Sequence, residues 1–215
     1  MITCRRELLD RELEKSVPLM KGNVLDIGGH KFNNRGRFRP PLNQVKSWVF
    51  LNNNSDTHPD YCCDASKIPL DNQTFDTVVM TEVFEYLEKP ELVLNEIYRL
   101  LTKNGYALIS VPFLNPVHGD HQFDRQRWTG VKLEEFFRSK DFSIININPM
   151  GSVWSVIHDI LHASTGYACS ISEKKYIRIF QKFLHVFTHF FLKFDSKAKW
   201  IQNYINTGYF ITLKK

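Results

Sequence analysis

The stretch NVLDIGGHKF, residues 23–32, decides the fold. A short apolar run ends in an acid, Asp26, and two glycines, Gly28 and Gly29, which is typical of a buried strand that turns sharply beneath a ligand. The residues that follow, NNRGRFRPPLN at 33–43, include two consecutive prolines, and proline disfavours the interior of a helix. The sequence therefore predicts a strand and a glycine turn without the long helix that usually comes next.

The missing helix limits the ligand that this turn can bind. A dinucleotide site has the pattern G-x-G-x-x-G leading into a helix, because the helix N-terminus binds the pyrophosphate. Only Gly28 and Gly29 are present, so the turn does not suit NAD. A nucleoside without a phosphate, such as S-adenosylmethionine, does not need that helix. We expect the glycines to let such a ligand approach the backbone closely.

Seven stretches of strand-like composition follow one another along the chain. They cover residues 23–29, 47–51, 61–63, 75–81, 106–112, 142–148 and 207–215. Helical patterns alternate with them at 5–16, 90–101 and 131–139. This alternation indicates an α/β fold, and we predict a Rossmann-like, doubly wound sheet of seven mostly parallel strands with an antiparallel last strand. The predicted single domain consists of an N-terminal helix (1–22), a cofactor-binding core (23–149), a helical insertion (150–206) and the last strand (207–215).

Composition and charge fit one globular domain. Of 215 residues, 43% are hydrophobic and 24% are charged, and the formal net charge is +5. Basic clusters at 31–39 and 174–199 lack a recognised nucleic-acid-binding module, so we expect no nucleic-acid partner. None of the four cysteines forms a C-x-x-C pair, the N-terminal residues are charged, and no apolar run is long enough to span a bilayer. These features predict a reduced, cytoplasmic protein without structural zinc.

Polar side chains stand at or just past the ends of four predicted strands. They are Asp26, Asn52, Asp64 and Glu82. In a parallel sheet, ligands bind at the carboxyl ends of the strands, where the strand order reverses. We therefore expect these side chains to share one site.

The motifs around these residues occur in a fixed order. VLDIGGH (24–30), VFLN (49–52) and CCDASKIPLDNQTFDTVVMTEVFEYLEKPELVLNEIYRLLTKNGYALISVPF (62–113) resemble the class I S-adenosylmethionine-dependent methyltransferases of the type 11-like group. Within that class, the chain is most similar to methyltransferases for small molecules and sugars in bacterial surface-polysaccharide pathways. The resemblance covers residues from about 23 to 148 and again 207 to 215.

The resemblance implies roles at the methionine end of S-adenosylmethionine. Asp26, Gly28 and Gly29 match the first motif, which lies under the methionine part. Glu82 follows the fourth strand, beside the amino-acid end of the cofactor. Tyr86 replaces the usual histidine of that motif, so the role of the histidine does not carry over.

The resemblance also implies roles at the nucleoside end. Asp64 with Ala65 matches the pair that meets the adenine, with the carboxylate accepting from the exocyclic amine. Asn52 stands where the family usually carries an acid that binds both ribose hydroxyls. Because a neutral amide makes weaker hydrogen bonds than a carboxylate, we expect lower cofactor affinity here.

The loop at 112–130, PFLNPVHGDHQFDRQRWTG, is similar to the substrate-side loop of this branch, which often carries His, Asp and Arg before Thr. The matching residues are His118, Asp124, Arg127 and Thr129. Asp124 and Arg127 either bind the substrate or form a salt bridge that braces the loop.

Two chemistries are open to the histidines of this loop. We predict His118 or His121 as the catalytic base, because imidazole titrates near neutral pH. A metal site from His118, Asp120 and His121 is possible by ligand type, but residues so close in sequence favour a solvated loop. We therefore expect no metal.

About sixty residues separate the last two predicted strands, and a segment of that length needs helices of its own. Apolar side chains recur there at helical spacing, with basic side chains on the other side. The apolar set is Ile179, Phe180, Phe183, Phe187, Phe190, Phe191 and Phe194. Such a pattern is typical of an interfacial helix, but helical aromatic stripes usually pack in a core. We predict a stripe mostly buried over the acceptor pocket or against a second subunit in a homodimer. The alternative is peripheral contact of 176–194 with the inner face of the membrane.

The residues and the resemblance together predict an enzyme that moves a methyl group from S-adenosylmethionine to an oxygen, chiefly by positioning the acceptor in line. We expect the acceptor to be a sugar hydroxyl or a related small molecule or glycan in surface-glycan biosynthesis. Two alternatives stay open. One is a methyltransferase for a lipid or quinone-like acceptor at the membrane surface, and the other is a catalytically inactive, methyltransferase-like binding module.

Overall fold

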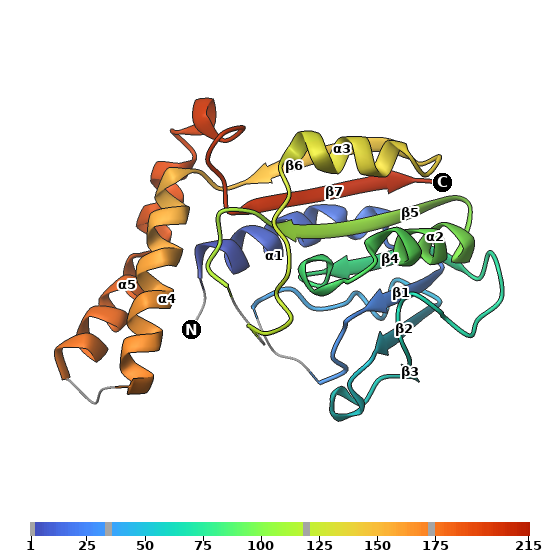
Figure 1. Ribbon diagram of the computed structural model, residues 1–215, viewed down its shortest axis with the longest axis horizontal. Helices are drawn as coiled ribbons and strands as arrows, with labels where there is room; N and C mark the ends of the chain where they lie inside the picture. Colours follow the sequence, from blue (N-terminus) through green and yellow to red (C-terminus); the bar gives the residue numbers. More distant parts are fainter. Residues whose placement is uncertain (1–2, 33–35, 118–120, 172–174) are drawn as a thin grey trace.

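A seven-stranded sheet forms the centre of the computed structural model, which describes residues 3–32, 36–117, 121–171 and 175–215 (Figure 1). The strands are β1 (Asn23–Ile27), β2 (Ser47–Asn52), β3 (Tyr61–Cys62), β4 (Phe75–Thr81), β5 (Leu101–Pro112), β6 (Ser143–Met150) and β7 (Gly208–Lys214). Their order is β3-β2-β1-β4-β5-β7-β6, and every neighbouring pair is parallel except the two that involve β7. The predicted mostly parallel sheet with an antiparallel last strand is confirmed.

Helices cover both faces of this sheet (Figure 1). They are α1 (Cys4–Ser16), α2 (Pro90–Leu100), α3 (Gly130–Arg138), α4 (Val153–Ile171) and α5 (Lys175–Asp195), with short 3-10 turns η1 (Val17–Leu19), η2 (Ser55–Thr57), η3 (Phe84–Tyr86) and η4 (Lys199–Ile201). The larger core contains Ile97 of α2 and Phe137 of α3. The smaller core, on the opposite face, contains Leu9 and Leu13 of α1.

Capping residues fix where the helices of the core begin. The Thr3 hydroxyl accepts a hydrogen bond from the Arg6 backbone N–H at 3.1 Å, and Pro90 occupies the first turn of α2. Thr129, from the predicted substrate-side loop, accepts from the Lys132 N–H at 3.3 Å and so caps α3. Its position in the motif therefore has a structural reason.

The chain between α2 and the body of β5 differs from the prediction. The strand was predicted to begin at residue 106, but β5 already begins at Leu101, which pairs with Phe75. The ladder then shifts register before Tyr106 pairs with Thr77, and Asn104 has a left-handed φ of 67° within the irregularity. Leu101 is fully buried, so its packing keeps this segment on the sheet.

No helix follows β1 in the described residues 28–32 and 36–46, as the two prolines predict. Phe38 and Val45 of this irregular segment pack against the α1-side core in place of a helix. The Arg37 N–H donates to Asp10 Oδ2 at 2.6 Å, and the Arg37 side chain forms an ion pair with Glu7. The segment is thereby fastened along α1.

Helices α4 and α5 form an antiparallel hairpin that projects beyond the end of the sheet (Figure 1). Its inner side contains Leu184, Thr188 and Leu192, all buried. Asp195, at the end of α5, accepts from the backbone N–H groups of Ser152 and Ser155 at 3.1 Å each. These contacts hold the base of the hairpin to the end of β6.

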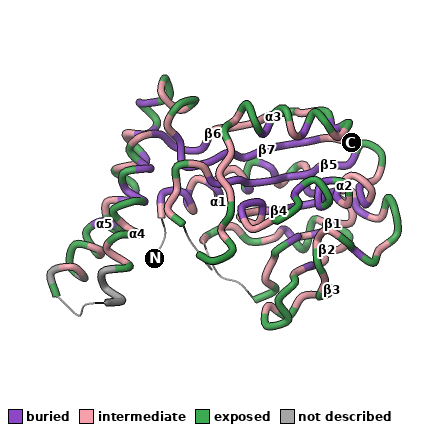
Figure 2. The backbone as a smooth tube through the Cα atoms, in the orientation of Figure 1, coloured by how far each residue is buried: buried purple, intermediate pink, exposed green. Residues whose placement is uncertain are grey.

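The aromatic stripe on α5 is not mostly buried, and that prediction is wrong within this chain (Figure 2). Phe183 is 49% exposed, Phe190 52% and Ile179 58%. The physical reason is the rotation of α5 about its own axis. Its buried side carries Leu184 and Leu192, and the aromatic stripe lies on the neighbouring side of the helix, which faces solvent.

Candidate functional site

The glycine turn after β1 is built around contacts within the protein. The Gly28 N–H donates to the Leu51 carbonyl at 2.7 Å, and Gly28 has a left-handed φ of 79°. A Cβ on Gly28 would come within 2.2 Å of Val83 Cγ2, and one on Gly29 within 2.5 Å of Asp26 Cγ. The glycines are therefore required by the fold itself, a reason that sequence reasoning, which considered only ligand approach, missed.

Asp26 lies half-buried beside this turn. The indole N–H of Trp48 donates to its carboxylate, with 3.3 Å between Nε1 and Oδ2. Burial raises the pKa of Asp26 to about 7, although the Trp48 hydrogen bond partly opposes the shift. Asp26 thus sits near its midpoint at neutral pH, so a positive charge nearby would favour its ionised form.

Asn52, at the end of β2, uses both ends of its amide inside the protein. Its Nδ2 donates to the Gly29 carbonyl at 3.1 Å, and its Oδ1 accepts from the Asn54 N–H at 3.0 Å. An aspartate here could not donate to Gly29. This cross-link supplies a structural reason for the amide where the family usually carries an acid.

Asp64 and Ala65 follow β3. Asp64 is exposed, and its Oδ1 accepts from the Ser66 N–H at 2.7 Å, which lowers the pKa of the carboxyl group below its ordinary value. Ala65 is half-buried against the larger core. The Asp64 carboxylate is therefore ionised at neutral pH and accessible to a ligand.

Glu82, just past β4, is held by Arg5 of α1. The Arg5 Nε donates to Glu82 Oε2 at 2.8 Å, and a second guanidinium nitrogen forms an ion pair with Oε1. The Ser110 hydroxyl also donates to Oε1 at 2.7 Å. Glu82 has a left-handed φ of 55°, a conformation uncommon for a non-glycine residue. Sequence reasoning missed Arg5, because the ion pair joins residues 77 positions apart without any local signal.

Helix α1 is in turn attached to the hairpin by Asp159 of α4. The carboxylate accepts from the backbone N–H groups of Cys4 and Arg5, each at 2.8 Å, and so caps the N-terminus of α1. His158 Nδ1 lies 2.8 Å from Asp159 Oδ1. The Arg5 side chain also donates to the Thr207 carbonyl at 3.0 Å.

Cys4, His158 and Asp159 bring three potential metal ligands within 4.8 Å of one another, all buried. Burial raises the pKa of the Cys4 thiol far above its ordinary value, so the thiolate that metals prefer is suppressed. The Asp159 oxygens already accept two backbone N–H groups. We therefore assign these three residues a structural role, in which they attach α1 to the hairpin.

One cavity of about 1300 Å³ joins several of these elements. Among the predicted cofactor residues, its lining contains Asp26, Gly28, Gly29 and Glu82. The wall also includes Arg5, residues 115–117 and, from α4, Asp159 and His162. Asn52, Asp64 and Ala65 are not part of this lining, although Asn52 contacts the Gly29 turn directly.

His162 is a cavity residue that sequence reasoning did not single out. Burial, followed by the nearby His158, lowers the pKa of His162 below its ordinary value. Its ring is therefore neutral at pH 7 and can accept a proton. Only its helical spacing from His158 offered a signal, and that spacing alone does not distinguish a site from packing.

The substrate-side loop gives a mixed result. His118 and Asp120 lie outside the described residues, and His121 is exposed and not part of the cavity wall. Arg127 and Asp124 pair through two hydrogen bonds, one of them at 2.7 Å, as the bracing role requires. Catalysis by His118 or His121 and substrate binding by Asp124 and Arg127 stay predictions.

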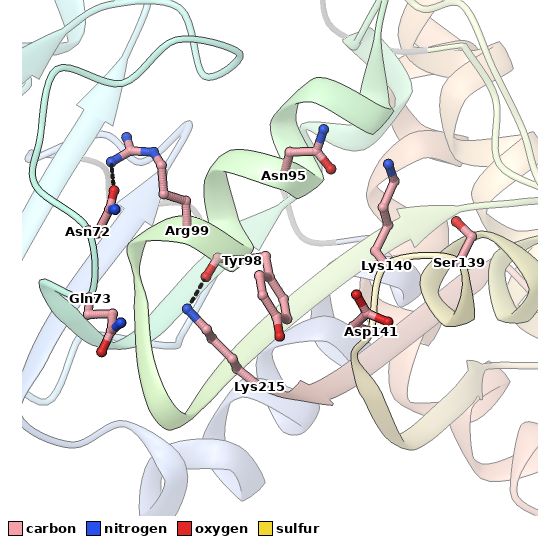
Figure 3. A pocket seen from close by; sticks show the side chains of 9 residues that line it. All are labelled: Asn72, Gln73, Asn95, Tyr98, Arg99, Ser139, Lys140, Asp141 and Lys215. Carbon is pink, nitrogen blue, oxygen red and sulfur yellow. Dashed lines mark hydrogen bonds between the residues drawn. The ribbon is translucent and has the colours of Figure 1, made fainter.

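A second, smaller cavity of about 530 Å³ lies near the start of β4, away from the carboxyl ends of the parallel strands (Figure 3). It is bordered by Gln73, just before β4, and by Lys215, just after the antiparallel β7. Lys215 Nζ donates to the Tyr98 carbonyl at 2.6 Å. Ligands of parallel sheets bind at the carboxyl ends of the strands, so we assign the site to the larger cavity.

The strand order and the residues at the strand ends define the fold of the class I S-adenosylmethionine-dependent methyltransferases. Residues 44–109 match the family described as a methyltransferase domain. The chain therefore has the class I fold, and part of its central sheet matches the methyltransferase-domain family. A search of curated protein sequences finds no match.

Three solved structures illustrate the similarity. An S-adenosylmethionine-dependent methyltransferase from Archaeoglobus fulgidus has a TM-score of 0.57 at 17% identity, covering 98% of this chain and 94% of that one. Phosphoethanolamine N-methyltransferase 2 from Haemonchus contortus, in complex with S-adenosyl-L-methionine, has a TM-score of 0.57 at 15% identity. The match covers 96% of this chain and 52% of that one. The [4+2]-cyclase SpnF has a TM-score of 0.58 at 16% identity, and the match covers 96% of this chain and 79% of that one. At these identities the likeness establishes the fold alone.

Proposed function

We propose that this chain is an S-adenosylmethionine-dependent methyltransferase that methylates a hydroxyl oxygen of a sugar or a related small molecule in surface-glycan biosynthesis. The observation that carries the proposal is the cavity of about 1300 Å³ that runs from the glycine turn to helix α4. Single-ligand pockets usually measure roughly 300–1,000 Å³. The cavity therefore has room for a cofactor and an acceptor side by side.

The residues at the strand ends fit the cofactor. When bound, S-adenosylmethionine supplies an activated methyl group on a positively charged sulfur. Asp26, whose pKa lies at about 7, can balance that positive charge by ionising. Gly28 and Gly29 line the cavity, and we assign Asp64, Ala65 and Asn52, which lie beyond its lining, to the nucleoside end. Both Glu82 oxygens are engaged by Arg5 and Ser110, so we assign Glu82 the task of shaping the turn after β4.

The protein must also position the acceptor hydroxyl and accept its proton. His118 or His121 remains our sequence-based candidate for the base. His162 joins them, because its ring is neutral at pH 7 and lines the cavity. Replacing His162 with glutamine should lower kcat and remove an acidic limb of the pH–rate profile, whereas Lys103→Gln, exposed near the start of β5, should change neither.

The charge of the cavity wall favours a phosphorylated acceptor. Arg6, Lys31 and Arg39 contribute to the lining. Arg6 pairs with Asp10 and Lys31 with Asp60, whereas the Arg39 side chain donates only to the carbonyls of its own segment in the part of the chain that the structure describes. Cationic side chains select phosphate groups. A sugar attached to a nucleotide or lipid phosphate, methylated in the cytoplasm, matches this wall.

Calorimetry with S-adenosylmethionine and S-adenosylhomocysteine tests the proposal. Both should bind to the full chain. Asp26→Ala should weaken the binding of S-adenosylmethionine at least about tenfold, since it removes the charge partner of the sulfonium, while the exposed Asp56→Ala should leave it unchanged. If neither ligand binds, the chain is a methyltransferase-like binding module. Mass spectrometry of glycans from cells with and without the protein then identifies the acceptor.

A second candidate function is methylation of a lipid or quinone-like acceptor. The exposed aromatic stripe of α5 favours it, because such acceptors reside in membranes. Incubating the protein with labelled cofactor and either a glycan or a lipid extract separates the two candidates by which fraction takes up label.

A further inference from the structure

The hairpin of α4 and α5 divides into sectors around its helix axes. On α5, the inner sector of Leu184, Thr188 and Leu192 is buried against the rest of the chain. A second sector carries phenylalanines at helical spacing, which we call the aromatic sector. It consists of Phe180, Phe183, Phe187, Phe190 and Phe194. A third, the basic sector, consists of Lys175, Lys182, His185, His189 and Lys193, all exposed.

The aromatic sector is one continuous surface. Ring centroids of Phe183 and Phe187 lie 4.2 Å apart, and those of Phe190 and Phe194 lie 4.6 Å apart. Phe187 and Phe190 join these pairs at 5.9 Å. Phe183 and Phe190 remain about half exposed, so this row of rings is open to solvent.

Helix α4 extends the same surface. Trp154 contacts Phe194 with ring centroids 5.4 Å apart. Ile157 and Leu161 follow Trp154 at helical spacing, and all three are between 36% and 41% exposed. A contiguous apolar surface spread over two helices marks an interaction site rather than scattered surface residues.

The charges beside this surface identify what covers it. Lys182 and Lys193 form no ion pair within the described residues, and Lys197 Nζ lies 5.9 Å from the Phe194 ring centroid. The acids of the described part of the hairpin, Asp159 and Asp195, are both only 3% exposed. All exposed charged side chains in the described part of the hairpin are thus positive. A second copy would bring the same positive charge against itself, whereas an anionic lipid surface would complement it.

We propose that the aromatic and basic sectors of the α4–α5 hairpin bind the surface of an anionic membrane. The phenylalanine rings enter the boundary between headgroups and acyl chains, and the lysines meet lipid phosphates. We find no helix, in the part of the chain that the structure describes, with the length and hydropathy to cross a bilayer. The inference is independent of methyl transfer, since a chain that binds no cofactor would still bind vesicles.

Co-sedimentation of the full chain with phosphatidylcholine vesicles, with and without phosphatidylglycerol, tests the proposal. The wild-type protein should bind the anionic vesicles and should bind the zwitterionic ones at least about tenfold more weakly. Phe183→Ser with Phe190→Ser should lower binding to anionic vesicles at least about tenfold. Because both rings are half exposed, this variant should stay folded, which circular dichroism verifies.

Matched controls separate the sectors from general hydrophobicity and charge. Leu92→Ser with Val131→Ser removes exposed apolar residues from α2 and α3 and should leave vesicle binding unchanged. Lys182→Glu with Lys193→Glu should abolish the preference for anionic lipid, whereas Lys46→Glu with Lys103→Glu should keep it. The proposal is overturned if the wild-type protein ignores anionic vesicles, or if the serine variant binds them as well as the wild type. Light scattering that shows a dimer lost only in the serine variant, without vesicle binding, would assign the surface to a second copy.

Discussion

Helices α2 and α5 have the same kind of sequence pattern and opposite surroundings. Both are amphipathic, with apolar residues at helical spacing. On α2 the apolar side is buried in the larger core, where Ile97 is 0% exposed. On α5 the aromatic side is open, with Phe183 49% exposed. Periodicity thus predicts a helix and its apolar side, but what covers that side depends on the neighbours that the chain brings to it.

The largest difference is expected from a matched pair of substitutions on these helices. Ile97→Ala should lower the free energy of unfolding by about 3 kcal/mol, because it leaves a cavity in the core. Phe183→Ala should lower it by less than about 1 kcal/mol, since its ring is half exposed. Urea denaturation measures both. Equal losses would mean that α5 packs as α2 does, and the contrast between the helices would fail.

The attachment of the hairpin gives the next largest effect. Asp159→Asn should cost about 2 kcal/mol of unfolding free energy, because a buried carboxylate that accepts two backbone N–H groups loses its charge. Hydrogen exchange should speed up at Cys4 and Arg5 but not in α2. The exposed Asp71→Asn is the control. Unchanged exchange at the start of α1 would show that the cap contributes nothing.

The half-buried acid Asp26, in the body of the protein, should make stability depend on pH. The pKa of Asp26 is about 7 in the folded protein, above its ordinary 3.8. The folded state therefore holds this proton more tightly than the unfolded state, so the wild type loses stability as the pH rises from about 4 to 7 and levels off above. Asp26→Asn lacks this loss and should gain about 2 kcal/mol over the wild type between pH 5 and pH 8. Denaturation curves at the two pH values measure the gain, and parallel behaviour of variant and wild type would refute it.

The smallest effect is expected at Asn52. Asn52→Asp loses the hydrogen bond to the Gly29 carbonyl and places two oxygens together, which should cost about 1 kcal/mol of stability. A carboxylate also makes stronger bonds to ribose hydroxyls. The sequence alone favours affinity that is kept or improved, and the two effects together should keep cofactor affinity within about fivefold. Calorimetry and denaturation on one preparation give both values; a more stable variant would show that the Gly29 contact is dispensable.

The elements that sequence reasoning placed well are those with local causes. The strand at 75–81 was predicted at its observed bounds, because its β-branched run and flanking turns act within a few residues. The lack of a helix in the described residues 28–32 and 36–46 followed from Pro40 and Pro41. The meeting of Asp26 and Glu82 at one cavity followed from the fixed geometry of parallel sheets, while their role in cofactor binding stays a prediction.

The features that sequence reasoning missed depend on contacts between distant segments. Arg5 reaches Glu82 across 77 positions and Asp159 reaches Cys4 across 155, and no spacing rule connects them. His162 enters the cavity only because the hairpin docks on α1. The exposure of the aromatic stripe was misjudged for the same reason, since burial depends on docking and not on pattern.

Arg5 has a thermodynamic consequence. Its backbone N–H is held by Asp159 of the hairpin, while its guanidinium holds Glu82 at the turn after β4. A single residue therefore belongs to both the hairpin attachment and the cofactor cavity. Thermodynamic linkage makes such a coupling reciprocal. If docking of the hairpin changes the cofactor affinity by some factor, cofactor binding changes the docking equilibrium by the same factor. The apparent cofactor affinity would then change as vesicles are added, and S-adenosylhomocysteine would shift the midpoint of the vesicle-binding curve by the same factor.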